Sequence, residues 1–172
     1  MTTYRDFDTP DSFTTAALGR PGQRIFLIQV RGEGEVVTLK CEKQQVAAIA
    51  HFVRELLADL PDGDAPLPDA LDIIPPRSNE ADSFDFVVGP IGVAYDRELD
   101  RVVIQLDEMV PLDENGEPDP DVVVGRVRGL ITRGQALAFC DHADEVVAAG
   151  RPNCRWCGFP IDPDGHPCPR MN

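Results

Sequence analysis

The sequence predicts an α+β protein: a mostly antiparallel sheet of about six strands with two helices, followed by a C-terminal zinc knuckle. Six segments show the alternation or β-branched content of strands, and two carry apolar residues at helical spacing. The order strand-strand-strand-helix occurs twice, as a βββα-βββα pseudo-repeat. We expect residues 1–150 to form the α+β domain and residues 151–172 to form the knuckle tail.

The first half contains three predicted strands, Phe13–Leu18, Arg24–Val30 and Glu35–Cys41. The segment Glu42–Leu60 follows, and its apolar residues recur with a period close to 3.6, which is typical of an amphipathic helix. The next segment, Pro61–Ser83, is rich in proline and acidic residues. We expect it to be a long exposed connection, partly disordered.

The second half repeats this order. Phe84–Tyr95 and Arg101–Met109 alternate apolar and polar residues and predict a hairpin. An acidic loop at Pro111–Pro120 leads to a third predicted strand, Asp121–Leu130.

The second helix has clear start and stop signals. Thr132 and Gln135 have the spacing of a capping box, in which each side chain binds the backbone amide of the other residue. We expect the helix to run to about Ala149, and Gly150 to end it in the left-handed conformation. One half alone has too few elements to close a core, whereas two halves sharing one sheet can do so.

The charge of the chain excludes several classes of partner. The formal net charge is −14, and the last 22 residues carry three Arg against two Asp, so the rest of the chain carries −15. Such a body repels nucleic acid and anionic membranes. The N-terminus is polar and no apolar run is long enough to span a bilayer, so we expect a cytoplasmic protein without membrane contact.

The tail contains the strongest motif. Four metal-ligand residues, Cys154, Cys157, His166 and Cys168, lie within fifteen positions of one another. Thiolates and imidazole at such spacing favour one Zn²⁺, and four protein ligands make a structural site. The alternative is a metal-free tail with reactive thiols; if His166 were not a ligand, water could take the open position.

Trp156 lies between the first two predicted ligands and is the only Trp. It could contact a partner protein or stack on a nucleic-acid base. We favour the simpler interpretation that it packs over the zinc ligands or against the body.

Four arginines are candidates for an anion site. Arg20 and Arg24 flank a glycine-bearing turn, and Arg126 and Arg128 lie on one face of a predicted strand. Together they could bind a phosphate or carboxylate. A plain hairpin turn and cross-strand ion pairs with Asp107 or Glu108 are the simpler explanations.

The sequence resembles a known family at several places: the turn Gly19–Arg24, the Lys-x-Gln entry to the first helix, the Arg126-Val-Arg128 strand and the tail motif CxxCGxPxDPxGHxCPR. The family is an uncharacterised actinobacterial domain of unknown function. It is described as encoded with a histidine-phosphatase-like protein and a protein resembling lipid kinases and HipA-type kinases. The resemblance therefore implies a phosphate-related process but no reaction. This chain departs from the pattern at Cys140-Asp-His142.

We therefore expect a non-catalytic adaptor or regulatory protein that holds one structural Zn²⁺ and docks a protein partner, with a small phosphorylated ligand as a further possibility. No nucleophile, general-base or cofactor motif supports an enzyme. Two alternatives stay open: an enzyme of phosphate or nucleotide metabolism that uses the four arginines, and nucleic-acid binding through the knuckle.

Overall fold

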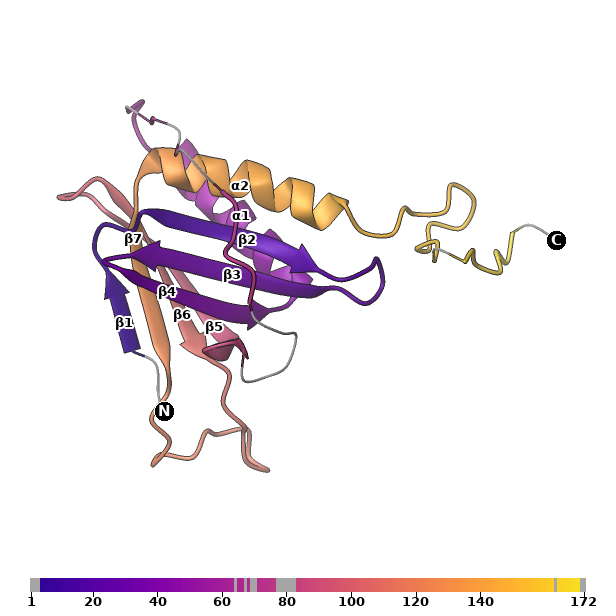
Figure 1. Ribbon diagram of the computed structural model, residues 1–172, viewed down its shortest axis with the longest axis horizontal. Coiled ribbons are helices and arrows are strands. Elements are labelled where there is room, and N and C mark those ends of the chain that lie inside the picture. Colours follow the sequence, from indigo (N-terminus) through magenta and orange to yellow (C-terminus); the bar gives the residue numbers. More distant parts are fainter. Residues whose placement is uncertain are drawn as a thin grey trace.

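The computed structural model describes residues 4–63, 65–66, 68, 71–76, 83–162 and 164–170. The elements in chain order are β1 (Tyr4–Phe7), β2 (Ser12–Leu18), β3 (Ile25–Gly32), β4 (Glu35–Cys41), α1 (Lys43–Ala58), β5 (Phe86–Asp96), β6 (Arg101–Glu108), β7 (Arg126–Ile131) and α2 (Arg133–Ala148). The strands form one sheet in the order β1-β7-β6-β5-β4-β3-β2, and both helices pack on one face of it (Figure 1). The predicted α+β class, with a mostly antiparallel sheet and two helices, is confirmed.

Apart from β1, the chain follows the predicted βββα-βββα order. Strands β2, β3 and β4 form one antiparallel meander, and β5, β6 and β7 form a second. The two meanders meet where β4 and β5 pair in parallel, over two residue pairs, Leu39 with Phe86 and Lys40 with Val87. Each half therefore contributes a complete three-stranded unit to the common sheet.

The two helices also begin in the same way. The backbone amide of Glu42 donates to the side-chain oxygen of Gln45 at 2.8 Å, and the amide of Thr132 donates to that of Gln135 at 2.9 Å. At the second helix the Thr132 hydroxyl accepts the Gln135 amide at 3.0 Å, so the predicted capping box is complete. The short sequence similarity at these positions thus corresponds to equivalent structure.

The strand β1 was not predicted, and it explains the shape of the sheet. It pairs in parallel with β7 at one edge, while β2 forms the opposite edge. Only residues 8–11 join these two strands, and such a link spans at most about 18 Å. Six strand spacings in a flat sheet would need about 29 Å. The sheet is therefore strongly curled, and a Cβ at Gly32 of β3 would lie 3.2 Å from the ring of Phe7.

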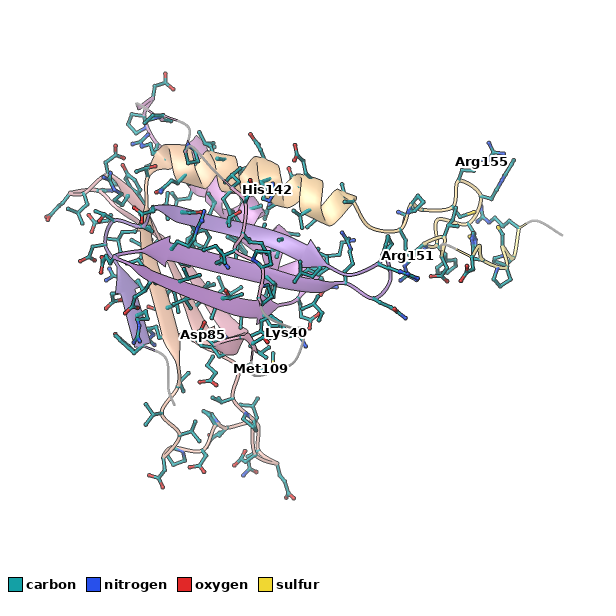
Figure 2. The ribbon with its side chains drawn as sticks, viewed as in Figure 1. Lys40, Asp85, Met109, His142, Arg151 and Arg155 are labelled. Atoms are coloured by element: carbon teal, nitrogen blue, oxygen red, sulfur yellow. The ribbon has the colours of Figure 1, made fainter. Side chains whose placement is uncertain are left out.

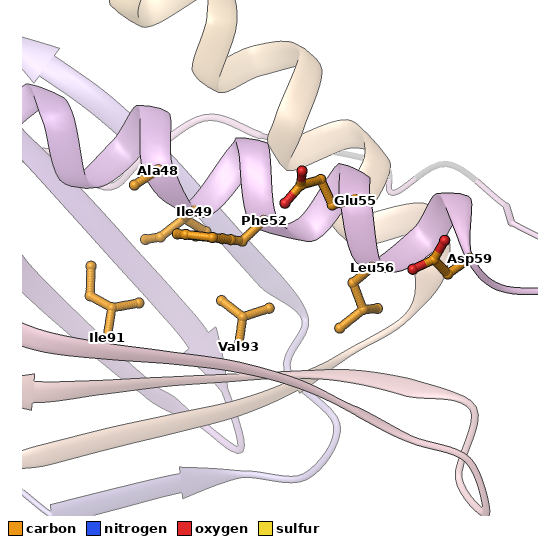
Figure 3. A pocket seen from close by; sticks show the side chains of 8 residues that line it. All are labelled: Ala48, Ile49, Phe52, Glu55, Leu56, Asp59, Ile91 and Val93. Carbon is orange, nitrogen blue, oxygen red and sulfur yellow. The ribbon is translucent and has the colours of Figure 1, made fainter.

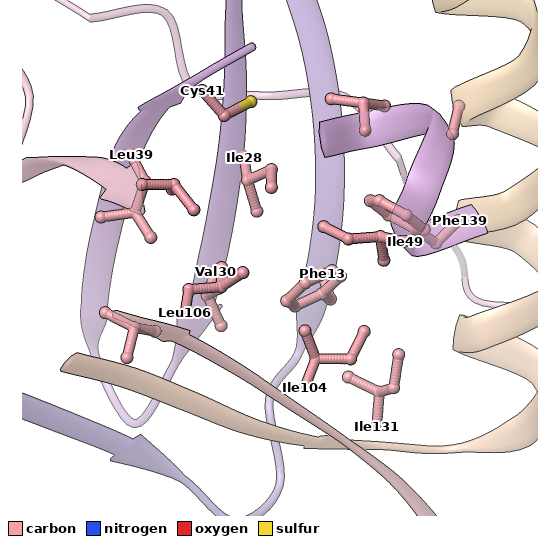
Figure 4. Close-up of a cluster of buried hydrophobic side chains, with 14 of the residues drawn as sticks. Phe13, Ile28, Val30, Leu39, Cys41, Ile49, Ile104, Leu106, Ile131 and Phe139 are labelled. Atoms are coloured by element: carbon pink, nitrogen blue, oxygen red, sulfur yellow. The ribbon is translucent and has the colours of Figure 1, made fainter. Parts of the chain in front are cut away.

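The core fills the space between the curled sheet and the two helices. The rings of Phe13 from β2 and Phe139 from α2 meet edge to face with centroids 5.1 Å apart. Figure 4 shows both rings among buried aliphatic side chains from both halves of the chain. These include Ile28, Val30, Leu39, Ile49, Ile104, Leu106 and Ile131. Both βββα units thus supply one common core, as the pseudo-repeat predicts.

The connection between α1 and β5 crosses the outer face of the first meander (Figure 1). Its residues 71–76 are exposed or half-buried, as expected, but they are bonded to two fully buried polar side chains. The Thr14 hydroxyl donates to the carbonyl of Leu71 at 2.5 Å, and the Gln29 amide exchanges two hydrogen bonds of 2.8 and 2.9 Å with the backbone of Ile74. The structure also describes residues 61–63, 65–66, 68 and 83 of this segment, and the other residues for which disorder was predicted lie outside the described residues.

Two boundaries differ from the predictions. The strand expected at Asp121–Leu130 is β7 and begins at Arg126, since the residues before it form a turn in which Val122 donates to Asp119 at 3.1 Å. Gly150 does not have a positive φ, so the predicted left-handed terminator is wrong. A Cβ at Gly150 would lie 2.8 Å from the Arg24 guanidinium, so a larger residue there would displace the end of that flexible side chain. Neither α1 nor α2 is long and apolar enough to cross a membrane, and the described residues contain no such helix.

Candidate metal centre

The described residues of the tail after α2, 151–162 and 164–170, are built from tight turns and contain no helix or extended strand. It extends from the C-terminal end of α2 (Figure 1). Gly158 and Gly165 have φ values of 77° and 91°, which side chains other than glycine rarely adopt. The Cys154 amide donates to the carbonyl of Phe159 at 2.7 Å, and the Gly158 amide returns a bond of 2.8 Å to the carbonyl of Cys154. This turn brings the two cysteines of the CxxC motif to the same side.

The four predicted ligands converge. The sulfur atoms of Cys154, Cys157 and Cys168 and a ring nitrogen of His166 all lie within 4.8 Å of one another. We call them the Cys3His cluster. The sulfurs of Cys154 and Cys168 are 3.8 Å apart, and the sulfur of Cys157 is 3.3 Å from Nε2 of His166. A tetrahedron with metal–sulfur bonds of about 2.3 Å has sulfur–sulfur edges of about 3.8 Å. The cluster could therefore hold a metal ion.

Backbone amides around the cluster favour a thiolate. The amide of Trp156 lies 3.4 Å from the sulfur of Cys154. Hydrogen bonds from the amides of Cys157 and Trp156 lower the pKa of the Cys154 thiol to about 6. Burial and the neighbouring Cys154 raise the pKa of Cys157 above its usual range. One ligand is thus ionised at neutral pH, and a bound cation would favour ionisation of the others.

The donor set fits a soft or borderline ion. Three thiolates and one imidazole suit Zn²⁺, which prefers tetrahedral sulfur and nitrogen ligands. When four protein atoms fill a tetrahedral ion, no position is left for water or substrate. The arrangement therefore suits an ion that orders the tail and not one that performs chemistry.

The tail also presents aromatic side chains to solvent. Trp156 is 51% exposed and Phe159 is 64% exposed. The guanidinium of Arg155 lies over the Trp156 ring, 4.8 Å from its centroid. Figure 2 shows Arg155 at the outer side of the tail and Arg151 beside the turn between β2 and β3. Sequence reasoning singled out Trp156 but missed Phe159, although an aromatic residue directly after a turn glycine was a usable signal.

The four candidate arginines are not gathered into one site. Arg20 lies in the turn between β2 and β3, and Arg24 lies at the end of that turn, where it donates to the carbonyl of Val146 in α2 at 3.0 Å. Arg126 and Arg128 lie in β7, which β4, β5 and β6 separate from β3 in the sheet.

The two arginines of β7 have neighbours on β6. Arg126 forms an ion pair with Asp107 at 2.6 Å, the simpler alternative considered from the sequence. Arg128 lies opposite Gln105. Among the described residues, the cavity beside Arg20 is not lined by Arg24, Arg126 or Arg128.

Arg20 instead lines a cavity between the body and the tail. The cavity has a volume of about 480 Å³, and its charged lining residues are Arg20, Arg151, Asp162 and Asp164. Arg151 pairs with Asp162 across this space. Two carboxylates offset the two guanidinium groups, so the cavity has no excess positive charge for an anion.

The fold and the cluster together define an α+β protein with a Cys3His cluster in its C-terminal tail. The chain belongs to DUF3090, a family of proteins of unknown function, which it matches over residues 5–168. The match includes all of the sheet except Tyr4 at the start of β1, both helices and all four residues of the cluster. Comparisons with curated proteins and with solved structures found no match. Membership of a family of unknown function, expected from the sequence, is confirmed.

Proposed function

We propose that this protein is a non-catalytic adaptor or regulatory protein whose tail is a structural zinc knuckle that docks a protein partner. One observation carries the proposal: the tail directs its metal-ligand side chains inward and leaves its large aromatic side chains exposed. The Cys3His cluster converges on a common point, while Trp156 and Phe159 stay exposed to solvent. A bound ion would fix the loop, and the loop would present the two rings.

The exposed rings of the tail are typical of a surface that binds another protein. Trp and Arg are among the residues that contribute most to binding energy in interfaces. Each large aromatic side chain buries about 150–250 Å² when covered. We call the stacked pair of Arg155 and Trp156, together with the exposed Phe159 three residues further along the chain, the tail aromatic surface. A fixed loop would lose little further entropy when this surface binds.

The proposal is tested by capture from native lysate with the tagged whole chain. The test variant is Trp156→Ala combined with Phe159→Ala, and the matched control is Leu99→Ala, an equally exposed residue in the turn between β5 and β6. We expect a stoichiometric partner with the wild type and the control, and none with the double variant. Zinc content, measured by mass spectrometry of the purified proteins, should be one per chain in all three.

Two results would overturn the proposal. Equal capture by the double variant would exclude the tail aromatic surface as the docking site. Absence of zinc from protein purified in zinc-supplemented medium would exclude the knuckle. A partner that handles phosphate groups would support the phosphate-related process that the family resemblance implies.

Nucleic-acid binding is a second candidate, supported by the stacking of Arg155 on the exposed ring of Trp156. Aromatic rings and guanidinium groups stack on bases in single-stranded nucleic acids. The net charge of −14 opposes it. Filter binding of a single-stranded oligonucleotide at low salt is the test, and no retention removes this candidate. The enzyme that would use four arginines has no support, since they do not share a site.

A further inference from the structure

A groove lies between α1 and β5, far from the tail in the sequence. Its volume is about 460 Å³, within the usual range for small-molecule sites. The walls are mainly apolar: Ala48, Ile49, Phe52 and Leu56 come from α1, and Ile91 and Val93 come from β5. Figure 3 shows Phe52 beside Ile49 under the helix, facing the two strand residues. Ile49 belongs to the core, but Phe52 is 55% exposed.

One end of the groove is negatively charged. Glu55 and Asp59 line it there, four residues apart on α1. Asp59 is also the C-cap of the helix, whose last turn contains no basic residue. Unpaired carbonyl groups give a helix C-terminus a partial negative charge, which favours cations. Two carboxylates at this end therefore increase a negative potential that the helix already has.

The described residues that line the groove include no Lys or Arg to neutralise this charge. The imidazole of His51 lies 3.5 Å from Glu55 and is itself exposed. Its ring lies 5.5 Å from that of Phe52. Two carboxylates face this one imidazole, so this end of the groove stays negatively charged whether or not the ring carries a proton.

Phe52 adds a third feature. The face of an aromatic ring attracts cations, most strongly ammonium groups that have lost part of their water shell. An exposed ring, an apolar wall and two carboxylates together match a molecule with an apolar body and a positively charged end. We propose that the groove binds a small organic cation, namely an amine whose apolar part lies against Phe52, Ile91 and Val93. Its ammonium group would lie towards Glu55 and Asp59.

This site does not involve the tail, so it stands or falls separately from the adaptor function. The size of the groove limits the ligand. Ala48 and Asp59 are eleven residues apart on α1, which corresponds to about 16 Å of helix. A chain or ring of about six to eight carbons with one ammonium group fits such a length.

The test uses three probes that share one apolar chain: hexylammonium, 1-hexanol and hexanoate. Each is titrated into the metal-loaded whole protein, labelled with ¹⁵N and ¹³C, and amide and methyl shifts are followed by NMR. We expect shifts centred on Phe52, Ile91 and Val93, with hexylammonium tightest, hexanol weaker and hexanoate weakest. The preference for hexylammonium over hexanol should be about tenfold at low salt and should shrink at 0.5 M salt.

Variants separate the two parts of the site. Phe52→Ala should weaken all three probes, whereas Leu137→Ala, a control on α2 with a partly exposed side chain, should weaken none. Glu55→Gln with Asp59→Asn should remove the preference for ammonium and leave hexanol unchanged. The matched charge control is Glu98→Gln with Glu114→Gln, two exposed acids outside the groove.

The wild-type titration alone can overturn the proposal. Shifts scattered over the acidic surface, equal affinity for the three probes, or no shift at the groove would each exclude an amine site there. Equal loss of ammonium preference in the charge control would show that the net charge of the protein, and not the groove, selects the cation.

Discussion

The body and the tail of this protein differ in the interactions that stabilise each of them. The body buries aromatic and aliphatic side chains from both halves in one cluster. In the tail, among the described residues from 151 to 170, Cys154 alone is buried. Hydrophobic burial therefore stabilises the body, whereas the tail has almost none. The comparison teaches that the tail needs another source of order, and the Cys3His cluster is the one that its sequence provides.

Removing the metal should cause the largest loss of stability, and this loss should be confined to the tail. Structural zinc contributes about 10–16 kcal/mol in small zinc-ordered folds. After chelation, or in Cys157→Ser, we expect NMR signals of residues 151–170 to move to random-coil positions while those of the sheet stay in place. Unchanged tail signals would show that the tail is ordered without metal.

Thiol labelling supplies an independent readout of the same experiment. Burial raises the pKa of Cys41 to about 12 and that of Cys140 to about 11. Since a raised pKa keeps a thiol protonated, at pH 8 fewer than about one in a hundred of either would be thiolate. A thiol reagent should therefore label three cysteines after chelation and none before it. Labelling of five in the folded protein would contradict this account of the body.

A substitution in the core should destabilise the body and leave metal binding by the tail unchanged. Phe139 is fully buried against Phe13, so Phe139→Ala should lower the free energy of unfolding by about 3–5 kcal/mol. Urea unfolding followed by circular dichroism measures this loss. Leu137→Ala, on the same helix but 39% exposed, should change it by less than about 0.5 kcal/mol. Zinc bound per folded chain should not change in either variant.

Gly134→Ala tests how closely the connection covers the body. Alanine favours helix over glycine by about 1 kcal/mol, but a Cβ at Gly134 would lie 1.7 Å from the carbonyl oxygen of Pro66. The clash with backbone outweighs the helix preference, so we expect a net loss of about 1–3 kcal/mol. In the control Gly92→Ala the new Cβ would lie 3.7 Å from Cβ of Gln105, an ordinary contact distance, and no loss of stability is expected. Thermal unfolding distinguishes the two.

The smallest effect concerns the start of α2. The hydroxyl of Thr132 accepts the amide of Gln135, and Thr132→Ala removes this bond. We expect a loss of about 1 kcal/mol, measured by urea unfolding against Thr132→Ser, which keeps the hydroxyl and should be nearly neutral. The metal content of the tail should be the same in both, since the cap lies at the far end of α2 from it.

The sequence predicted the elements whose signals are local. Alternation in β6 and the helical period of α1 are set by burial of one face, and both are confirmed. The strand β1 gave no such signal, because three of its four residues are exposed and its pairing is with β7, far along the chain. Gln29 is a polar residue within the apolar run of β3, and in the structure it is buried and bonded to the backbone of Ile74. The spacing of residues in the sequence could not identify this partner.

The same distinction applies to the candidate site. The Cys3His cluster was predictable because its ligands lie close in the sequence and spacing alone restricts how they can meet. The groove was not predictable, because Phe52 of α1 and Ile91 of β5 lie far apart in the sequence and line the same groove only in the folded protein. For the arginines the sequence offered only shared chemistry, whereas in the structure Arg24 bonds to the carbonyl of Val146 and Arg126 pairs with Asp107.

The short parallel pairing between β4 and β5 has a consequence for how the molecule opens. Two residue pairs join the meanders there, whereas neighbouring strands within a meander share six or seven. We therefore expect amide hydrogens along this line to exchange with solvent faster than those within either meander. The connection bonded to Thr14 and Gln29 crosses the first half before it enters β5. These hydrogen bonds tether the segment that leads into β5 to the outer face of the first half, away from the short β4–β5 ladder.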